Sequence, residues 1–486
     1  MASLRALMCL TSLLVASSSR AQEPELPAVP PPHEEEPAAE GPAPDARTLS
    51  LSEAVRMALE GNFGLLDAAD SVAVARWNES TARAQFLPRL TPRYQRGDDQ
   101  SLFALDASQR VPWLGGSLSG TAGYRSSDQV GPVPAGKSTD LRLALSQPLL
   151  RGFGPNATYY DLRNARRQRQ RQERGFDVQR QALAVTVARA YYAVVRQRAL
   201  MGVSRQSLLR TKGLREASDA RMQVGLASKL DVFRAELQAS QTEDALVQAQ
   251  ASLDESKENF RLLLGLPAGA AVEPAASSLG EADIELAPIE ELVATAFGQR
   301  PELQEARDQI DDARRTASLA RQNLWPQLDL TVAVSRLGFG PGLGDSLEAG
   351  DTQLNVFLST SYPLERTADR ANKAISELEV EAQRRALRQR EQDVEAEVRT
   401  AVRNIERIRK SVELQKKSVE FAEQQLRLAS LRYQRGLASN FDVVDAEGNL
   451  VTARSALVGL LTDLQVARVQ LLRVLGTLDV ATEFAT

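Results

Sequence analysis

Two very long stretches of helix-forming residues constrain this chain more than any other feature of its sequence. Residues 157–220 and 366–434 are rich in Ala, Leu, Arg, Gln and Glu and contain no proline, a composition that favours unbroken α-helix. At about 1.5 Å per residue, helices of these lengths would span roughly 96 and 104 Å, about three times the diameter of a small domain. The chain is therefore expected to be mainly α-helical and extended.

Four shorter helical segments match the two long ones in total length. Stacked end to end, 62–87 and 226–265 would reach roughly 99 Å, and 300–325 with 439–475 roughly 95 Å. The sequence thus predicts four parallel rods of nearly equal length. These segments alone would fit an elongated helical bundle or a coiled-coil scaffold equally well.

The two halves of the chain repeat each other. The motif Arg221-Met-Gln-Val-Gly-Leu-Ala-Ser-Lys-Leu-Asp-Val232 recurs 211 residues later as Arg432-Tyr-Gln-Arg-Gly-Leu-Ala-Ser-Asn-Phe-Asp-Val443. Each half has the same order of short helix, strands, very long helix, turn and shorter helix. We assign a first structural repeat to 48–266, a connector to 267–290 and a second repeat to 291–486.

Extra residues interrupt this repeat in the first half. Pro88 and Pro326 align at an offset of 238, whereas Pro148 and Pro363 align at an offset of 215. The first half therefore carries about 23 residues without a counterpart, and we place them in 89–112. The sequence pattern predicts no particular structure for that segment.

Two regions change from helical periodicity to the alternation of apolar and polar residues that is typical of strands. Each region, about 117–148 and 328–360, contains two alternating segments around a loop rich in glycine, at about 126–138 and 337–351. The sequence therefore predicts two hairpins, with four strands per chain.

Four strands are too few to close a β-barrel, because the smallest outer-membrane barrels need about 8. Three copies would supply 12 strands, with apolar side chains outside and polar ones inside. Trp113, Trp325 and Tyr362 lie near the strand ends, where aromatic residues flank the membrane-spanning part of a barrel. We therefore expect a trimeric barrel in contact with outer-membrane lipid.

The N-terminal residues are expected to lie outside the folded repeats. Arg5, an apolar stretch and small residues ending at Ala21 are typical of a secretory signal peptide over 1–21. Residues 22–47 are rich in Pro, Ala and Glu, which indicates a flexible linker.

Composition excludes several classes of function. Removing the signal peptide changes the formal net charge from −4 to −6, because Arg5 and Arg20 leave and no acid does. This mild acidity argues against nucleic acid as a partner. The only cysteine, Cys9, and the only histidine, His33, lie in the N-terminal segments. The repeats thus lack the residues of Ser-His-Asp, Cys-His and usual zinc sites, and we predict no enzyme, no cofactor and no metal site.

A run of arginines follows the first pair of strands. Helix N-termini normally favour acids, yet the long helix at 157–220 begins with six arginines. Their position below the predicted barrel indicates either contact with anionic lipid headgroups or a solvated helix face. They are Arg163, Arg166, Arg167, Arg169, Arg171 and Arg174.

At its turns and strand boundaries the chain resembles the TolC family of outer-membrane efflux and secretion proteins. The resemblance covers essentially 48–478. It implies a homotrimer with a 12-stranded barrel, a 12-helix periplasmic tunnel and a mixed equatorial belt, to which we assign 267–290. The matching motifs are Phe86-Leu-Pro88 and Leu324-Trp-Pro326 before the strands, Gln147-Pro-Leu-Leu-Arg-Gly-Phe-Gly154 after them, and the two Gly-Leu-Ala-Ser turns.

The resemblance also implies a function and partners. In this family the channel is the exit duct of a tripartite efflux pump or a type I secretion system. Its helical tips dock a periplasmic adaptor, which links it to an inner-membrane pump. The alternative left open is a periplasmic coiled-coil scaffold or adaptor protein. The adaptor-docking turns implied here are Val224, Gly225, Leu226, Arg435, Gly436 and Leu437.

The periplasmic aperture of the family also has counterparts in this chain. The sequence departs from the family at Ala438, where a latch arginine would stand, and at Ala220, where the partner of the latch tyrosine would stand. The resemblance therefore implies an aperture ring and leaves open how the tips are held closed. The matching residues are Asp442 and Asp445 in the aperture ring, and Asp231 and Tyr433 in the tip latch.

Overall fold

The computed structural model describes residues 47–98, 100–127, 136–270, 272–275 and 286–478. Its contacts divide the chain into two units, Met1–Asp45 and Ala46–Thr486, and the second unit contains all of the described residues. The signal peptide expected at 1–21 lies outside the described residues. The linker expected at 22–47 also lies outside them, except for its last residue.

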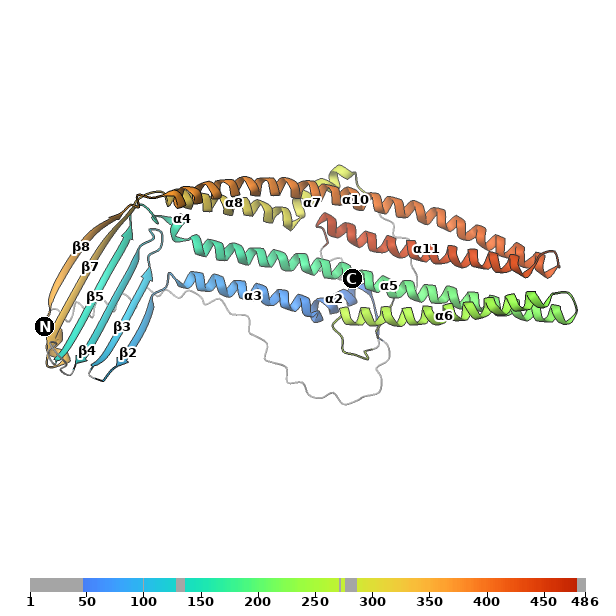
Figure 1. The fold of residues 1–486 in the computed structure, drawn as a ribbon, viewed down its shortest axis with the longest axis horizontal. Helices are drawn as coiled ribbons and strands as arrows, with labels where there is room; N and C mark the ends of the chain where they lie inside the picture. Colours follow the sequence, from blue (N-terminus) through green and yellow to red (C-terminus); the bar gives the residue numbers. More distant parts are fainter. Residues whose placement is uncertain (1–46, 99, 128–135, 271, 276–285, 479–486) are drawn as a thin grey trace. The chain divides into compact units, whose positions relative to one another are not determined.

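Two long helices dominate the described chain (Figure 1). α5 spans Tyr160–Gln223 and α10 spans Thr367–Gln434, close to the ranges expected from composition. The buried apolar residues of α10 recur every three or four positions, which places them on one helix face. These residues are Val394, Val398, Val402, Ile405, Ile408 and Val412.

Each long helix carries two shorter helices along its length. α3 (Phe63–Ala84) and α6 (Lys229–Leu263) pack on α5. α8 (Pro301–Gln322) and α11 (Asn440–Leu475) pack on α10, and α11 also packs on α5. In this order of contacts, α3 and α6 form one flank of the helical part and α10 forms the other (Figure 1).

Among the described helices, α11 alone is long and apolar enough to cross a membrane, judged by length and composition. It packs along α10 and α5 instead. Only 28% of its most apolar stretch is buried within the chain. Much of its apolar surface is therefore open to further contacts.

A small mixed region joins the two halves. β1 (Arg47–Leu49) and β6 (Val272–Pro274) pair in parallel. α2 (Leu51–Gly61) packs on α5, and α7 (Ile289–Gln299) packs on α10. Of the connector expected at 267–290, residues 271 and 276–285 lie outside the described residues.

The larger of the two sheets in the described part of the chain has six antiparallel strands in the order β2-β3-β4-β5-β7-β8 (Figure 1). The prediction of four strands was wrong, because the segment 89–112 forms a further hairpin. Alternation did not reveal it, because β2 contains Pro92 and three arginines, and β3 contains the apolar run Leu102-Phe-Ala-Leu105. The strands are β2 Arg89–Arg96, β3 Gln100–Arg110, β4 Ser117–Ser127, β5 Gly136–Pro148, β7 Gln327–Gly340 and β8 Asp351–Ser361.

The pairing register gives the sheet two different faces. Leu143 on β5 lies opposite Gly120 on β4 and Val334 on β7, and residues two apart along each strand continue the same face. This face is mainly apolar on all six strands, and the other face is mainly polar. The apolar face includes Leu90, Tyr94, Phe103, Leu105, Leu118, Ala122, Tyr124, Leu141, Leu143, Leu145, Leu330, Val332, Val334, Leu354, Val356 and Leu358.

A short helix lies on the sheet at the tip of the last hairpin. α9 (Leu343–Glu348) packs on β5 and β7, and the Thr139 hydroxyl donates to the Ser346 carbonyl at 2.9 Å. A Cβ on Gly338 would lie 1.8 Å from that carbonyl oxygen. The helix lies this close to the strand because the strand has glycine there. α4 (Pro155–Thr158) precedes α5 at the other end of the sheet.

Candidate functional site

The turn between α5 and α6 is built by a glycine and a helix cap. α5 ends at Gln223, Gly225 has a φ of 76°, and Ser228 caps α6. Oδ2 of Asp231 accepts hydrogen bonds from the Ser228 nitrogen at 3.1 Å and the Ser228 hydroxyl at 2.7 Å. The recurring glycine, serine and aspartate of the sequence motif are thus explained by turn and capping-box chemistry.

The turn between α10 and α11 repeats this construction and contains the two expected aperture aspartates. Gly436 has a φ of 76°, and Ser439 caps α11. Oδ2 of Asp442 accepts from the Ser439 nitrogen at 2.8 Å and the Ser439 hydroxyl at 3.1 Å. Asp445 accepts from the Asn449 amide at 3.3 Å. Both hydrogen bonds involving Asp442 stabilise the start of α11.

The two turns present exposed apolar side chains. Val224 is 69% exposed, Leu226 68% and Leu437 66%. Grouped apolar side chains at one end of a molecule suit contact with another protein. All six residues expected to dock an adaptor are exposed: Val224, Gly225, Leu226, Arg435, Gly436 and Leu437.

Tyr433 joins the end of α10 to α5. Its side chain is buried, its hydroxyl lies 2.9 Å from the Ser218 hydroxyl, and the Arg221 guanidinium lies 4.7 Å from the ring centroid. Arg221 also donates a hydrogen bond to the Tyr433 backbone carbonyl. The Asp231 carboxylate, expected in the same latch, contacts Ser228 instead. The structure therefore gives Tyr433 the partners Ser218 and Arg221.

Two further contacts join the hairpins near the tips. The buried Asn440 side chain, at the start of α11, donates to the Asp231 carbonyl at 2.5 Å. Further along α11, the buried Glu447 accepts two hydrogen bonds from Arg210 of α5, at 2.7 and 2.8 Å. A bidentate pair of this kind is among the stronger polar contacts. Residues around Tyr433 and Glu447 line a cavity of about 400 Å³.

The sequence singled out Tyr433 as a candidate but did not indicate the residues that contact it. One signal was present, because Arg221 is the first residue of the repeated turn motif and Arg432 is its counterpart. The pairing of Arg210 with Glu447 joins residues 237 positions apart. No local pattern indicates such a contact.

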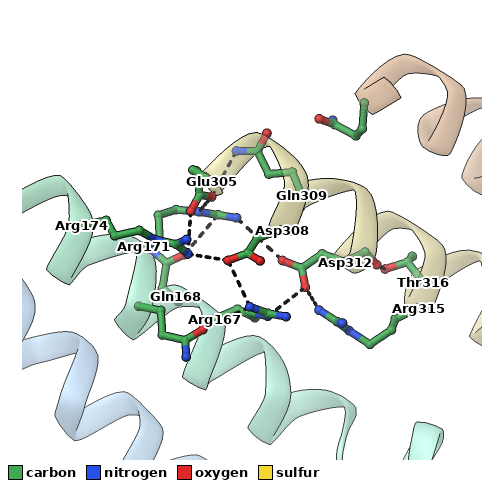
Figure 2. A network of polar contacts seen from close by, with 12 residues as sticks. Arg167, Gln168, Arg171, Arg174, Glu305, Asp308, Gln309, Asp312, Arg315 and Thr316 are labelled. Carbon is green, nitrogen blue, oxygen red and sulfur yellow. Dashed lines mark hydrogen bonds and ion pairs between the residues drawn. The ribbon is translucent and has the colours of Figure 1, made fainter. Parts of the chain in front are cut away.

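Near the sheet, arginines of α5 pair with acids of α8 (Figure 2). Arg174 Nη2 lies 3.0 Å from Glu305 and 2.8 Å from Asp308, and Arg167 Nη1 lies 3.1 Å from Asp308. Arg171 Nε lies 2.6 Å from Glu305. These arginines therefore join two helices, a role that the sequence did not indicate.

Glu79 joins α3 to α5 in the same region. Its side chain is buried and accepts from Arg169 at 2.5 Å and from Arg83 at 2.7 Å. Burial acts to raise the pKa of the Glu79 carboxyl, but hydrogen bonds and charge attraction to Arg169 and Arg83 outweigh it and hold the pKa below its ordinary value of 4.5. Glu79 is therefore charged at neutral pH and stabilises the contact between the helices.

Fold and tips together define a class of protein. A sheet with one apolar and one polar face is suited to a barrel wall, and the long paired helices continue from it to the joined tips (Figure 1). This is the architecture of outer-membrane channels with a helical tunnel in the periplasm. In the part of the chain that is described, no group of three or more His, Cys, Asp or Glu side chains could hold a metal ion.

The chain belongs to the outer membrane efflux protein family, whose model matches residues 54–266 and 292–477. The toluene efflux pump outer membrane protein TtgC of Pseudomonas putida is 26% identical over 305 residues, 61% of this chain and 60% of that protein. Nodulation protein T of Rhizobium leguminosarum bv. trifolii is 23% identical over 268 residues, 53% of this chain and 55% of that protein. The chain thus matches less than two thirds of either relative's length.

Solved structures show the same fold. The outer membrane protein VceC from Vibrio cholerae has a TM-score of 0.67 at 20% identity, covering 88% of this chain and 96% of that one. The open state of the Neisseria gonorrhoeae MtrE outer membrane channel has a TM-score of 0.66 at 19% identity, covering 88% of both chains. The family match and the fold confirm the resemblance indicated by the sequence motifs.

Proposed function

We propose that three copies of this chain form the outer-membrane exit channel of a tripartite efflux pump or a type I secretion system. The observation that carries the proposal is the sheet, which has an apolar and a polar face and leaves β2 and β8 as its two edges. Exposed strand edges pair with other strands unless they are protected. A sheet in lipid must also close so that every backbone group is paired. Joining of several copies into one barrel meets both conditions.

The helical flanks support joining of copies in the same order. α6 and α10, on opposite flanks, both expose apolar side chains that one chain alone leaves in water. Contact between the α10 flank of one copy and the α3–α6 flank of the next would bury them. The exposed residues include Leu230, Phe233, Leu237 and Val247 on α6, and Leu414, Phe421, Leu428 and Leu431 on α10.

The helical tips would form a gate at the periplasmic end. In each copy, Tyr433 with Arg221, and Glu447 with Arg210, hold the α10–α11 hairpin against α5, so opening would break these contacts. Asp442 and Asp445 of three copies would place six carboxylates around one axis. Rings of acids favour cations.

The exposed turns are suited to a periplasmic adaptor that links the channel to an inner-membrane pump. The relative TtgC is described as a pump component, which supports this assignment. A periplasmic coiled-coil scaffold would use the long helices in a similar way. It would have no use for a sheet with an apolar face, so the sheet favours the channel.

Planar-bilayer recording tests the proposal. The full chain is extracted with mild detergent from the outer-membrane fraction and added to one side of the bilayer. We expect discrete conductance steps. A protein recovered from the periplasm in plain buffer, without conductance, would overturn the proposal in favour of the scaffold.

A further inference from the structure

The first half of the chain contains one hairpin more than the second half. β7 and β8 form the single hairpin of the second half, whereas β2 to β5 form two hairpins in the first. The offset between the halves is 238 at Pro88 and Pro326 and 215 at Pro148 and Pro363. The difference of about 23 residues corresponds to two strands, and the additional hairpin is β2 with β3, which together span residues 89–110. An even number of added strands returns the chain to the helical end of the sheet.

The additional hairpin is continuous with the rest of the sheet. β3 pairs with β4 over their whole length, from Gln100 opposite Ser127 to Arg110 opposite Ser117. Side chains reinforce the pairing, because Asp106 on β3 lies 2.9 Å from Arg93 on β2 and accepts from the Thr121 hydroxyl on β4 at 3.1 Å. The hairpin is thus part of the wall and not a flap attached to it.

The hairpin also has the two faces of the sheet. On the apolar face, Tyr94 lies opposite Phe103, which lies opposite Tyr124, and the Tyr94 and Phe103 ring centroids are 4.4 Å apart. On the polar face lie Arg93, Asp106 and Thr121. An apolar outer face and a polar inner face are what a strand in a membrane barrel requires.

Each edge of the sheet lies on the same side of the chain as one of the helical flanks (Figure 1). The edge strand β2 follows α3, which belongs to one flank, and the edge strand β8 leads into α10, the other flank. When a neighbouring copy packs against α10, its β2 therefore lies beside β8 of the first copy, in antiparallel orientation. β8 has no proline, and Asp351 is its only charged residue, so it lacks the devices that protect a free edge, whereas β2 contains Pro92 and three arginines.

We infer that each copy contributes six strands, and that three copies close an 18-stranded barrel in which β8 of one copy pairs with β2 of the next. This inference rests on the proposed trimeric channel and replaces the 12 strands expected from the sequence. Barrel diameter grows roughly in proportion to strand number, so the pore would be about one and a half times as wide as that of a 12-stranded barrel. Barrels of 16–18 strands leave an aqueous channel. Selection by size would then occur at the helical tips, and the barrel would pass bulky solutes.

Disulfide trapping distinguishes an 18-stranded barrel, in which β8 pairs with β2 of the next copy, from a 12-stranded barrel, in which β8 pairs with β4 of the next copy. The chain has a clean background, because its only cysteine, Cys9, lies in the expected signal peptide. Ser359→Cys on the polar face of β8 is combined with one cysteine on the polar face of either β2 or β4. Three positions per strand allow for the unknown shear of the closed barrel. The β2 series is Arg89→Cys, Thr91→Cys and Arg93→Cys, and the matched β4 series is Ser117→Cys, Ser119→Cys and Thr121→Cys.

We expect covalent trimers on non-reducing gels with at least one pair of the β2 series and none with the β4 series or with Ser359→Cys alone. Covalent trimers with the β4 series would overturn the inference, because the additional hairpin would then lie outside a 12-stranded barrel. Electron cryo-microscopy of the wild-type particle in detergent counts the strands independently, and 12 strands would overturn it as well. If the particle does not contain three chains, the proposed function itself fails.

Discussion

Replacing Arg221 with alanine is expected to loosen the helical tips. The substitution removes a guanidinium that lies 4.7 Å from the Tyr433 ring centroid and donates to the Tyr433 carbonyl. A cation–π contact at a partly exposed site contributes about 1 kcal/mol, and the hydrogen bond contributes about 1 kcal/mol. A loss of about 2 kcal/mol per copy corresponds to roughly a thirty-fold shift of each tip toward its open form.

Single-channel recording in planar bilayers measures this shift as an open probability. Arg432→Ala is the matched control, because Arg432 is the counterpart of Arg221 in the second repeat and is exposed. We expect Arg221→Ala channels to spend much more time in a high-conductance state, and Arg432→Ala channels to resemble wild type. Equal open probabilities in the two variants would refute the assignment of Arg221 to the latch. An unchanged circular dichroism spectrum would show that the fold is retained.

Asp445→Asn should weaken the block of conductance by a trivalent cation added on the periplasmic side. Asp244→Asn, which changes an exposed carboxylate further along α6, should leave the block unchanged. Equal block in both variants would exclude Asp445 from the aperture. Glu79→Gln should lower the free energy of unfolding by about 2 kcal/mol at neutral pH, measured by thermal melting in detergent. Because the folded-state pKa of Glu79 lies below 4.5, this stabilisation is present above pH 4.5 and is lost as the pH falls through the folded value. The difference between wild type and Glu79→Gln should therefore shrink in acid, and a constant difference would contradict the charged pairing. Gly338→Ala should displace α9, because the new Cβ would lie 1.8 Å from the Ser346 carbonyl oxygen; unchanged protease resistance of the α9 segment would contradict this packing.

Composition was sufficient to predict the long helices. The range 157–220 was expected from residue preferences alone, and the structure has α5 at Tyr160–Gln223. Helix propensities add along a chain, so a proline-free run of helix-forming residues of this length strongly favours one unbroken helix. The end of the helix was also predictable, because Gly225 must provide the left-handed turn that other residues resist.

The additional hairpin was not predictable from alternation. A strand shows alternation only when its two faces differ in polarity at every position. On β3, Leu102 and Ala104 lie on the polar face, opposite in direction to Phe103 and Leu105 on the apolar face. The run therefore reads as uniformly apolar. Only the strand pairing with β4 distinguishes its faces.

The contacts of the candidate gate required the folded chain. The hydroxyls of Ser218 and Tyr433 meet across 215 positions of sequence. Their proximity depends on the register between α5 and α10, which the packing of α11 between them sets. The partners of the arginine run were missed for a related reason. Arg167 and Arg174 look unpaired on α5, because Asp308 approaches them from a helix that begins more than 100 residues later.

Native mass spectrometry of the full chain, extracted with mild detergent from the outer-membrane fraction, tests most directly whether several copies enclose one channel. The two edges of the sheet, β2 and β8, leave a single copy unable to close a barrel. We expect a particle of three chains that separates on heating. A stable monomer, soluble in buffer without detergent, would contradict the channel.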